Sequence, residues 1–95
     1  MSVEHLESQI ESGAVKQGTN WIWMKCNFTH FPDRVCFGSG GKVVFIEFKT
    51  KTGPTRPGQK LIQDKLKAFG FPVYTCRSKE EALAVLAKEF KVHVR

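Results

Sequence analysis

The sequence lacks a long apolar run, and its first residues lack the pattern of a secretory leader, so we expect neither a membrane-spanning nor a secreted protein. No stretch approaches the roughly 18 consecutive apolar residues that a membrane-spanning helix requires. The first residues include Glu4, His5 and Glu7, so they lack the basic flank and apolar centre of a signal peptide. We therefore expect a cytoplasmic protein without a membrane partner.

Cysteine is scarce, and its placement argues against a disulfide or zinc scaffold. Cys26, Cys36 and Cys76 are odd in number, widely spaced and set among apolar residues. The three histidines form no ligand pair by spacing. Residues 38–43, GSGGKV, lack the spacing and the hydroxyl residue of a P-loop. We expect buried, reduced thiols that pack as small hydrophobic groups.

Acidic residues are also in short supply. Nine Asp and Glu face fifteen Lys and Arg, which gives a net charge of +6 and favours a polyanionic partner such as nucleic acid without identifying one. The 95 residues, 41% of them hydrophobic, include eight Phe, which indicates a folded chain with one small core. We predict a single domain over residues 1–95 with no internal repeat.

Hydrophobic periodicity predicts helices and strands in the order αβββαβα. An apolar residue at every fourth position indicates an amphipathic helix over 3–16. A second helix begins in 55–59 and ends at Gly70, and Ser78 with Glu81 forms an S-x-x-E signature that opens a third. Strands are predicted over 20–28, 34–37, 42–49 and 71–76, and residues 91–95 form an edge strand or a partner-facing tail.

The spacing of these elements predicts a mixed sheet flanked by helices. The sequence GSGG supplies the positive φ angles of a tight hairpin, so the two strands beside it are antiparallel. The helix that follows residues 42–49 is long enough for a right-handed crossover to a parallel strand.

Two charges interrupt the most strand-like run, VVFIEFKTK. Strand alternation puts Glu47 and Lys49 on one face, at the C-terminal end of the strand. One interpretation is a solvated ion pair at a strand end. The other comes from the hairpin: if 34–37 pairs with 42–45, Asp33 lies near Ile46 or Glu47. Two converging carboxylates stay ionised only around a cation, and hard oxygen ligands favour Mg²⁺ or Mn²⁺, with Lys49 beside a water.

These residues carry a family resemblance. Pro-Asp at 32–33 followed by Glu-Phe-Lys at 47–49 is similar to the P-D…(D/E)-x-K motif of the restriction-endonuclease-like nucleases. A hairpin links the two halves, a Gly/Pro loop follows, a Gln opens the next helix, and GFPVYTCRSKEEA closes the layout. Over residues 7–87 the chain resembles the VRR-NUC nucleases, particularly the stand-alone versions of phages and bacteria.

The resemblance implies a restriction-endonuclease-like α/β fold and metal-dependent cleavage of DNA. It implies a homodimer that acts on branched DNA such as four-way (Holliday) junctions, in the cytoplasm of a bacterial or phage-infected cell, with Mg²⁺ or Mn²⁺ and no small organic cofactor. Two alternatives stay open. The chain is a non-catalytic nucleic-acid-binding module with the same fold, or it is a basic structural domain with an accidental motif.

The resemblance also assigns roles by position. Asp33 and Glu47 match the metal-binding carboxylates, Lys49 matches the catalytic lysine, and the backbone carbonyl of Phe48 completes the metal shell. Gln59 matches the glutamine that opens the next helix and is a further catalytic candidate. The family's acidic residue on the first helix corresponds to Glu7, with Glu4 and Glu11 as weaker candidates.

Three further sets of residues bear on DNA binding. Lys51, Arg56 and Lys60 are candidate phosphate contacts, because basic side chains cluster after the motif and only Asp64 is acidic between 50 and 79. His30 stands where the family usually has Gly, and it is either an incidental surface residue or a DNA contact. Trp21 and Trp23 share one strand face, where core or subunit packing is favoured over base stacking.

Overall fold

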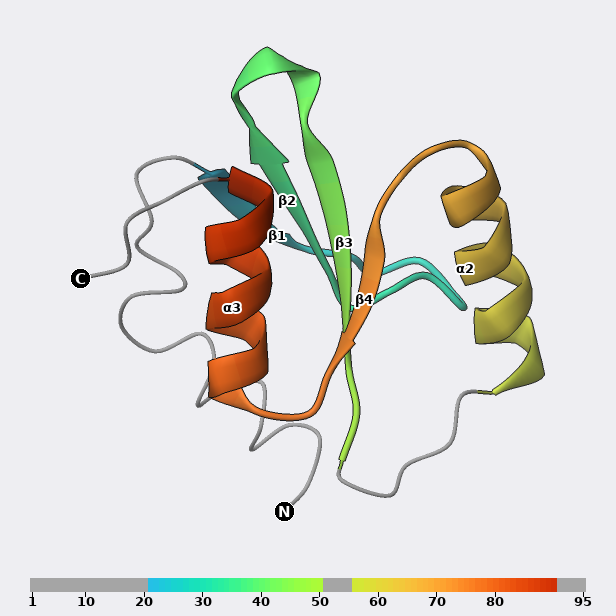
Figure 1. The fold of residues 1–95 in the computed structure, drawn as a ribbon. Helices are drawn as coiled ribbons and strands as arrows, with labels where there is room; N and C mark the ends of the chain where they lie inside the picture. Colours follow the sequence, from blue (N-terminus) through green and yellow to red (C-terminus); the bar gives the residue numbers. More distant parts are fainter. Residues whose placement is uncertain (1–20, 51–55, 91–95) are drawn as a thin grey trace.

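A computed structural model describes residues 21–50 and 56–90, and they form a four-stranded sheet with one helix on each face (Figure 1). The α/β class with a mixed sheet is confirmed. The helix predicted over 3–16 and the segment 91–95 lie outside the described residues. The strands, in their order across the sheet, are β1 (Trp21–Lys25), β2 (Arg34–Gly38), β3 (Val43–Phe48) and β4 (Val73–Cys76), and the helices are α2 (Pro57–Ala68) and α3 (Lys79–Phe90).

The strand directions follow the predicted topology. Strand β2 is antiparallel to both β1 and β3, whereas β4 is parallel to β3 and is reached through α2. The hairpin turn is a short 3₁₀ segment, η1 (Ser39–Gly41), in which Gly40 and Gly41 have φ angles of 72° and 77°. Glycine adopts this left-handed region at little steric cost, so GSGG makes the predicted turn.

The register of the hairpin differs by one residue from the pairing of 34–37 with 42–45. Arg34 lies opposite Ile46 and Phe37 opposite Val43. The shift arises because Gly38 belongs to the ladder, where its N–H donates to the carbonyl of Lys42 at 2.8 Å, which leaves three residues in the turn. Extending this register by one step places Asp33 across from Glu47.

The sheet separates two hydrophobic clusters. On the α3 face, Val44, Ile46 and Phe48 are buried with Trp21 and Leu86, and Trp23 stacks on Phe48 with ring centroids 6.1 Å apart. The two tryptophans therefore pack in the core of the monomer, as favoured. The smaller cluster on the α2 face contains Val35, Phe45 and Leu66. The alternation predicted for β3 is confirmed.

All three cysteines are free thiols, in agreement with the expectation of no disulfide framework. Cys36 and Cys76 are fully buried and Cys26 is partly buried. Removal from water raises the pKa of both Cys36 and Cys76 to about 12, so these thiols stay protonated and pack as apolar groups.

The helix ends follow the sequence signals. Helix α2 has Pro57 in its first turn and is followed by Gly70 with a φ of 97°. At the start of α3 the N–H of Glu81 donates to the Ser78 hydroxyl at 3.2 Å, and the Glu81 carboxylate accepts from the N–H of Arg77 at 2.9 Å. Among the described residues no helix is long and apolar enough to cross a membrane.

Truncation of a side chain in the hydrophobic cluster on the α3 face should clearly lower the stability of the protein. Leu86 is fully buried against the sheet, so Leu86→Ala leaves a cavity and should lower the free energy of unfolding by about 2 to 5 kcal/mol. Urea titration followed by circular dichroism measures this loss. Ala84→Ser, on the exposed side of the same helix, is the matched control. An equal loss in both variants would mean that Leu86 is not part of a tightly packed core.

Candidate active site

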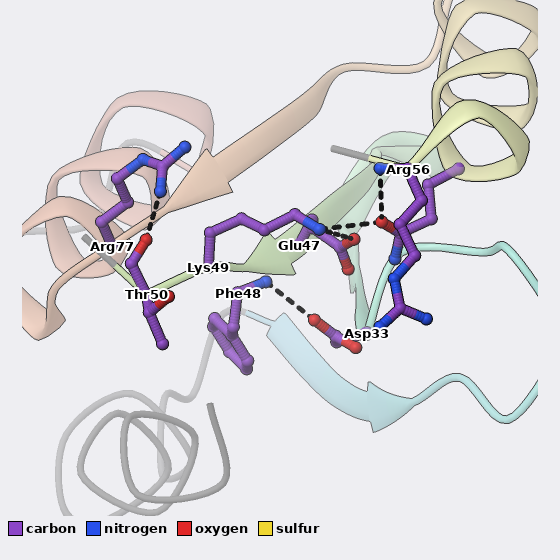
Figure 2. Close-up of polar contacts among 8 residues, drawn as sticks. Asp33, Glu47, Phe48, Lys49, Thr50, Arg56 and Arg77 are labelled. Atoms are coloured by element: carbon purple, nitrogen blue, oxygen red, sulfur yellow. Dashed lines mark hydrogen bonds and ion pairs between the residues drawn. The ribbon is translucent and has the colours of Figure 1, made fainter. Parts of the chain in front are cut away.

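Charged and polar side chains gather at the C-terminal end of β3 (Figure 2). Glu47 is the penultimate residue of this strand, and Lys49 follows it on the same face. Asp33 arrives from the segment just before β2, and Gln59 comes from the first turn of α2. The structure thus brings together four of the residues singled out in the sequence: Asp33, Glu47, Lys49 and Gln59.

Asp33 is fixed by its neighbours on both sides. Its Oδ2 accepts a hydrogen bond of 2.8 Å from the N–H of Phe48, so its carboxylate is tied to the end of β3. Its backbone carbonyl accepts from the N–H of Cys26 at 2.9 Å and from the guanidinium of Arg34, also at 2.9 Å. Pro32, fully buried, sets the backbone just before it.

The backbone of Phe48 faces the same carboxylate. In a strand, the N–H and C=O of one residue point to the same side. Because the Phe48 N–H donates to Asp33, its carbonyl oxygen is directed to that edge of β3 as well. The next N–H, from Lys49, points the opposite way and donates to the carbonyl of Cys76 at 3.1 Å.

Glu47 is the least usual group of the site. Only 1% of it is exposed, and within the described chain neither carboxylate oxygen accepts a hydrogen bond. The Lys49 ammonium lies 3.4 Å from Oε2 as an ion pair. Burial and the nearby Asp33 raise the pKa of Glu47 from 4.5 to about 8, and the charge of Lys49 opposes the shift. A buried carboxylate without donors is costly, so the site favours an added proton or cation.

Lys49 is held on its other side by Gln59. The Lys49 Nζ donates to Oε1 of Gln59 at 2.8 Å, and the same oxygen accepts a long bond of 3.4 Å from the N–H of Arg56. Only 10% of the Lys49 side chain is exposed. The ammonium is therefore clamped between a carboxylate and an amide and points along the sheet face rather than into solvent (Figure 2).

Of the remaining candidate residues, some lie in the described segments and others lie outside them. Arg56 and Lys60 are both exposed at the start of α2, but Lys60 pairs with Asp64 at 2.8 Å, so part of its charge is already neutralised. Lys51 and Glu7, with the alternatives Glu4 and Glu11, lie outside the described residues. In residues 21–50 and 56–90 no three His, Cys, Asp or Glu side chains come together as a metal cluster.

His30 is exposed and has a backbone conformation that favours glycine. Its φ is 69°, the sole positive value at a non-glycine residue of the described segments. Its ring lies over Gly58 in the first turn of α2: a Cβ on Gly58 would be 2.6 Å from both Nδ1 and Cε1 of His30. The position thus keeps the backbone that a Gly would adopt while it places a ring against α2.

Sequence reasoning missed two arginines that support the site. Arg34 is 3% exposed, and its guanidinium lies 5.4 Å from the centre of the Phe48 ring. Arg77 donates to the carbonyl of Thr50 just after the site (Figure 2). The sequence shows both arginines only as contributors to the positive net charge. No spacing in it signals a contact between residues so far apart in the chain.

No protein-family model matches the chain, and no curated protein matches it significantly.

Proposed function

We propose that this protein is a metal-dependent DNA endonuclease with a restriction-endonuclease-like fold, selective for branched DNA such as four-way junctions. The observation that carries the proposal is the pairing of Asp33 with a buried Glu47 that accepts no hydrogen bond within the described chain, at a strand end where Lys49 is held. A domain that only binds DNA has no use for two carboxylates that repel phosphate.

The donor set fits a hard divalent cation. Asp33, Glu47 and the carbonyl of Phe48 would hold Mg²⁺ or Mn²⁺, since all three supply oxygen and the two carboxylates supply negative charge. The Glu47 oxygens, to which no group in residues 21–50 and 56–90 donates a hydrogen bond, are the strongest support for this fit. Glu7 is the proposed acid from the first helix. When bound, the cation would supply positive charge to the phosphate during cleavage.

The polar residues of this chain account for the remaining requirements of hydrolysis. A water must attack phosphorus in line with the leaving oxygen, whose bond to phosphorus breaks. Lys49 is positioned to orient that water and to stabilise the phosphate charge, and Gln59 fixes the ammonium for this role. Arg56, Lys60 and Lys51 would grip the DNA backbone without reading its sequence.

A homodimer in the bacterial or phage-infected cytoplasm completes the proposal. One site per protomer suits paired nicks across a symmetric junction. The monomer also leaves Ile22, Met24 and Phe37 exposed around β1 and β2, by 63%, 49% and 38% respectively. Apolar side chains of this kind are available for burial between subunits.

The proposal is tested by cleavage of end-labelled DNA. Purified protein is incubated with four-way junction, duplex or single-stranded DNA in Mg²⁺, Mn²⁺ or EDTA. We expect cuts in the junction that require the metal. Tight binding without cleavage under every metal condition would reject the nuclease and leave a nucleic-acid-binding module in its place.

Removal of the Gln59 side chain tests whether its hydrogen bond to the Lys49 ammonium matters for cleavage. In Gln59→Ala the ammonium loses its 2.8 Å acceptor, so we expect kcat on junction DNA to fall by about tenfold, with Mn²⁺ affinity unchanged. Single-turnover cleavage and calorimetric titration measure the two quantities. Gln63→Ala, one turn further along α2, is the control. A full rate in Gln59→Ala would remove Gln59 from the site.

A further inference from the structure

We propose that His30 is a positioning residue, whose ring on Gly58 holds the segment that carries Asp33 against the first turn of α2. This inference rests on the proposed function, because it assigns His30 to the alignment of the two halves of the nuclease site. One part, made of Asp33, Glu47 and Lys49, lies on the sheet, and the other, Gln59, lies on α2.

The contact joins elements that are separate in the sheet. His30 lies in the connection between β1 and β2, three residues before Asp33, and Gly58 lies one residue before Gln59. In Figure 1 this connection reaches across to α2, beyond the strands that it joins. A displacement of Gly58 would therefore move Gln59, whose amide oxygen holds the Lys49 ammonium.

The fit between the two residues is tight enough to be specific. A Cβ on Gly58 would lie 2.6 Å from two atoms of the His30 ring and 2.9 Å from Cγ, and real Cβ atoms do not approach so closely. Any larger residue at 58 must push the ring out or shift the start of α2. His30 has a left-handed backbone and its ring lies against a residue without a side chain, so we treat the two residues as a pair.

The chemistry assigns His30 an alignment role rather than a catalytic one. Asp33 is tied independently to the N–H of Phe48, so its place does not depend on the ring. Loss of the ring should release Gln59 and Lys49 while the carboxylates stay in position. We expect His30→Gly and His30→Asn, which both tolerate a positive φ, to lower kcat on junction DNA by about tenfold and to leave KM and Mn²⁺ affinity unchanged.

A cycle of variants tests the contact without reference to cleavage. In the natural background Gly58→Ala should lower Tm, because the new Cβ displaces the ring. In the His30→Gly background the same change should raise Tm by a few degrees, because Ala has the higher helix propensity. The same sign in both backgrounds would overturn the pairing.

Chemical labelling tests the consequence for the site. Acetylation of Lys49, measured by mass spectrometry against the exposed Lys67, should accelerate in His30→Gly, because the ammonium loses its clamp. Val85→Ala, on α3 across the sheet, controls for a general loss of stability. Unchanged Lys49 labelling in His30→Gly would overturn the positioning role. A natural protein that cleaves no DNA would reject the nuclease proposal, and the labelling and the Tm cycle would still decide the role of His30.

Discussion

Replacement of Lys49 by alanine should reduce the cleavage of junction DNA by about 10³-fold, because it removes the one cation held between Glu47 and Gln59 in the described site. Binding of junction DNA should change little, since the ammonium is buried away from the exposed basic side chains. Mn²⁺ affinity should rise or stay the same, because the variant also removes a positive charge 3.4 Å from the Glu47 carboxylate. Single-turnover cleavage, gel-shift assays and calorimetry measure the three quantities.

The control for this experiment is a lysine with the same chemistry in a different place. Lys60→Ala removes an exposed ammonium that is paired with Asp64. It should alter DNA affinity and its salt dependence more than the rate of cleavage. If Lys49→Ala cleaves at the natural rate, the clamped ammonium is a structural ion pair and the proposed catalytic role is wrong.

Replacement of Glu47 by glutamine should abolish high-affinity Mn²⁺ binding and, in the absence of metal, stabilise the protein at neutral and alkaline pH. The first effect follows from the loss of a charged oxygen ligand. The second follows from burial, because an ionised carboxylate to which the described residues donate no hydrogen bond opposes folding more than a neutral amide does.

The pKa of Glu47 determines at which pH the Glu47→Gln variant is more stable than the natural protein. The pKa of Glu47 is about 8 in the folded chain and 4.5 as its ordinary value, so between these values the folded state binds the additional proton. Stability of the natural protein therefore falls as pH rises from about 4.5 to about 8, and it is lowest above that window. Glu47→Gln should remove this slope and, at pH 8, regain part of the roughly 4 kcal/mol that ionisation of the buried carboxyl costs the natural protein.

Urea titration at pH 5 and pH 8 in EDTA measures this difference. Glu80→Gln, at an exposed position on α3, is the matched control and should leave the slope intact. Mn²⁺ should reverse the ranking at pH 8, because it stabilises the natural protein alone. A pH slope that persists in Glu47→Gln would show that another group is responsible, and unchanged Mn²⁺ binding would remove Glu47 from the proposed metal site.

The sequence predicts this fold well where a local signal is strong. Gly40 and Gly41 specify the hairpin turn, Gly70 the end of α2, and the S-x-x-E signature at Ser78 the start of α3. The sequence does not determine the register of the hairpin, because GSGG allows a turn of either three or four residues. A single step matters here: it would move Asp33 to the α3 face, away from Glu47.

The residues of the site also differ in whether the sequence predicts them. Asp33, Glu47 and Lys49 were found from strand alternation and hairpin pairing, which are short-range properties of the chain. The contact of His30 with Gly58 could not be found, because it depends on how a loop meets a helix after both have packed on the sheet. Its one local signal, a positive φ at a histidine, exists only in the folded backbone.

The end of β3 at Glu47 and Phe48 also limits which substitutions the protein can accept in evolution. The Phe48 ring supports the α3-side cluster beside Trp23 and Arg34, while its N–H holds the Asp33 carboxylate. A substitution that adapts the core at this position therefore perturbs the site as well, and one that adapts the site perturbs the core. New specificity is more accessible through exposed residues such as Lys60 in α2 and Thr29 in the β1 to β2 connection, whose side chains can be exchanged without repacking the interior.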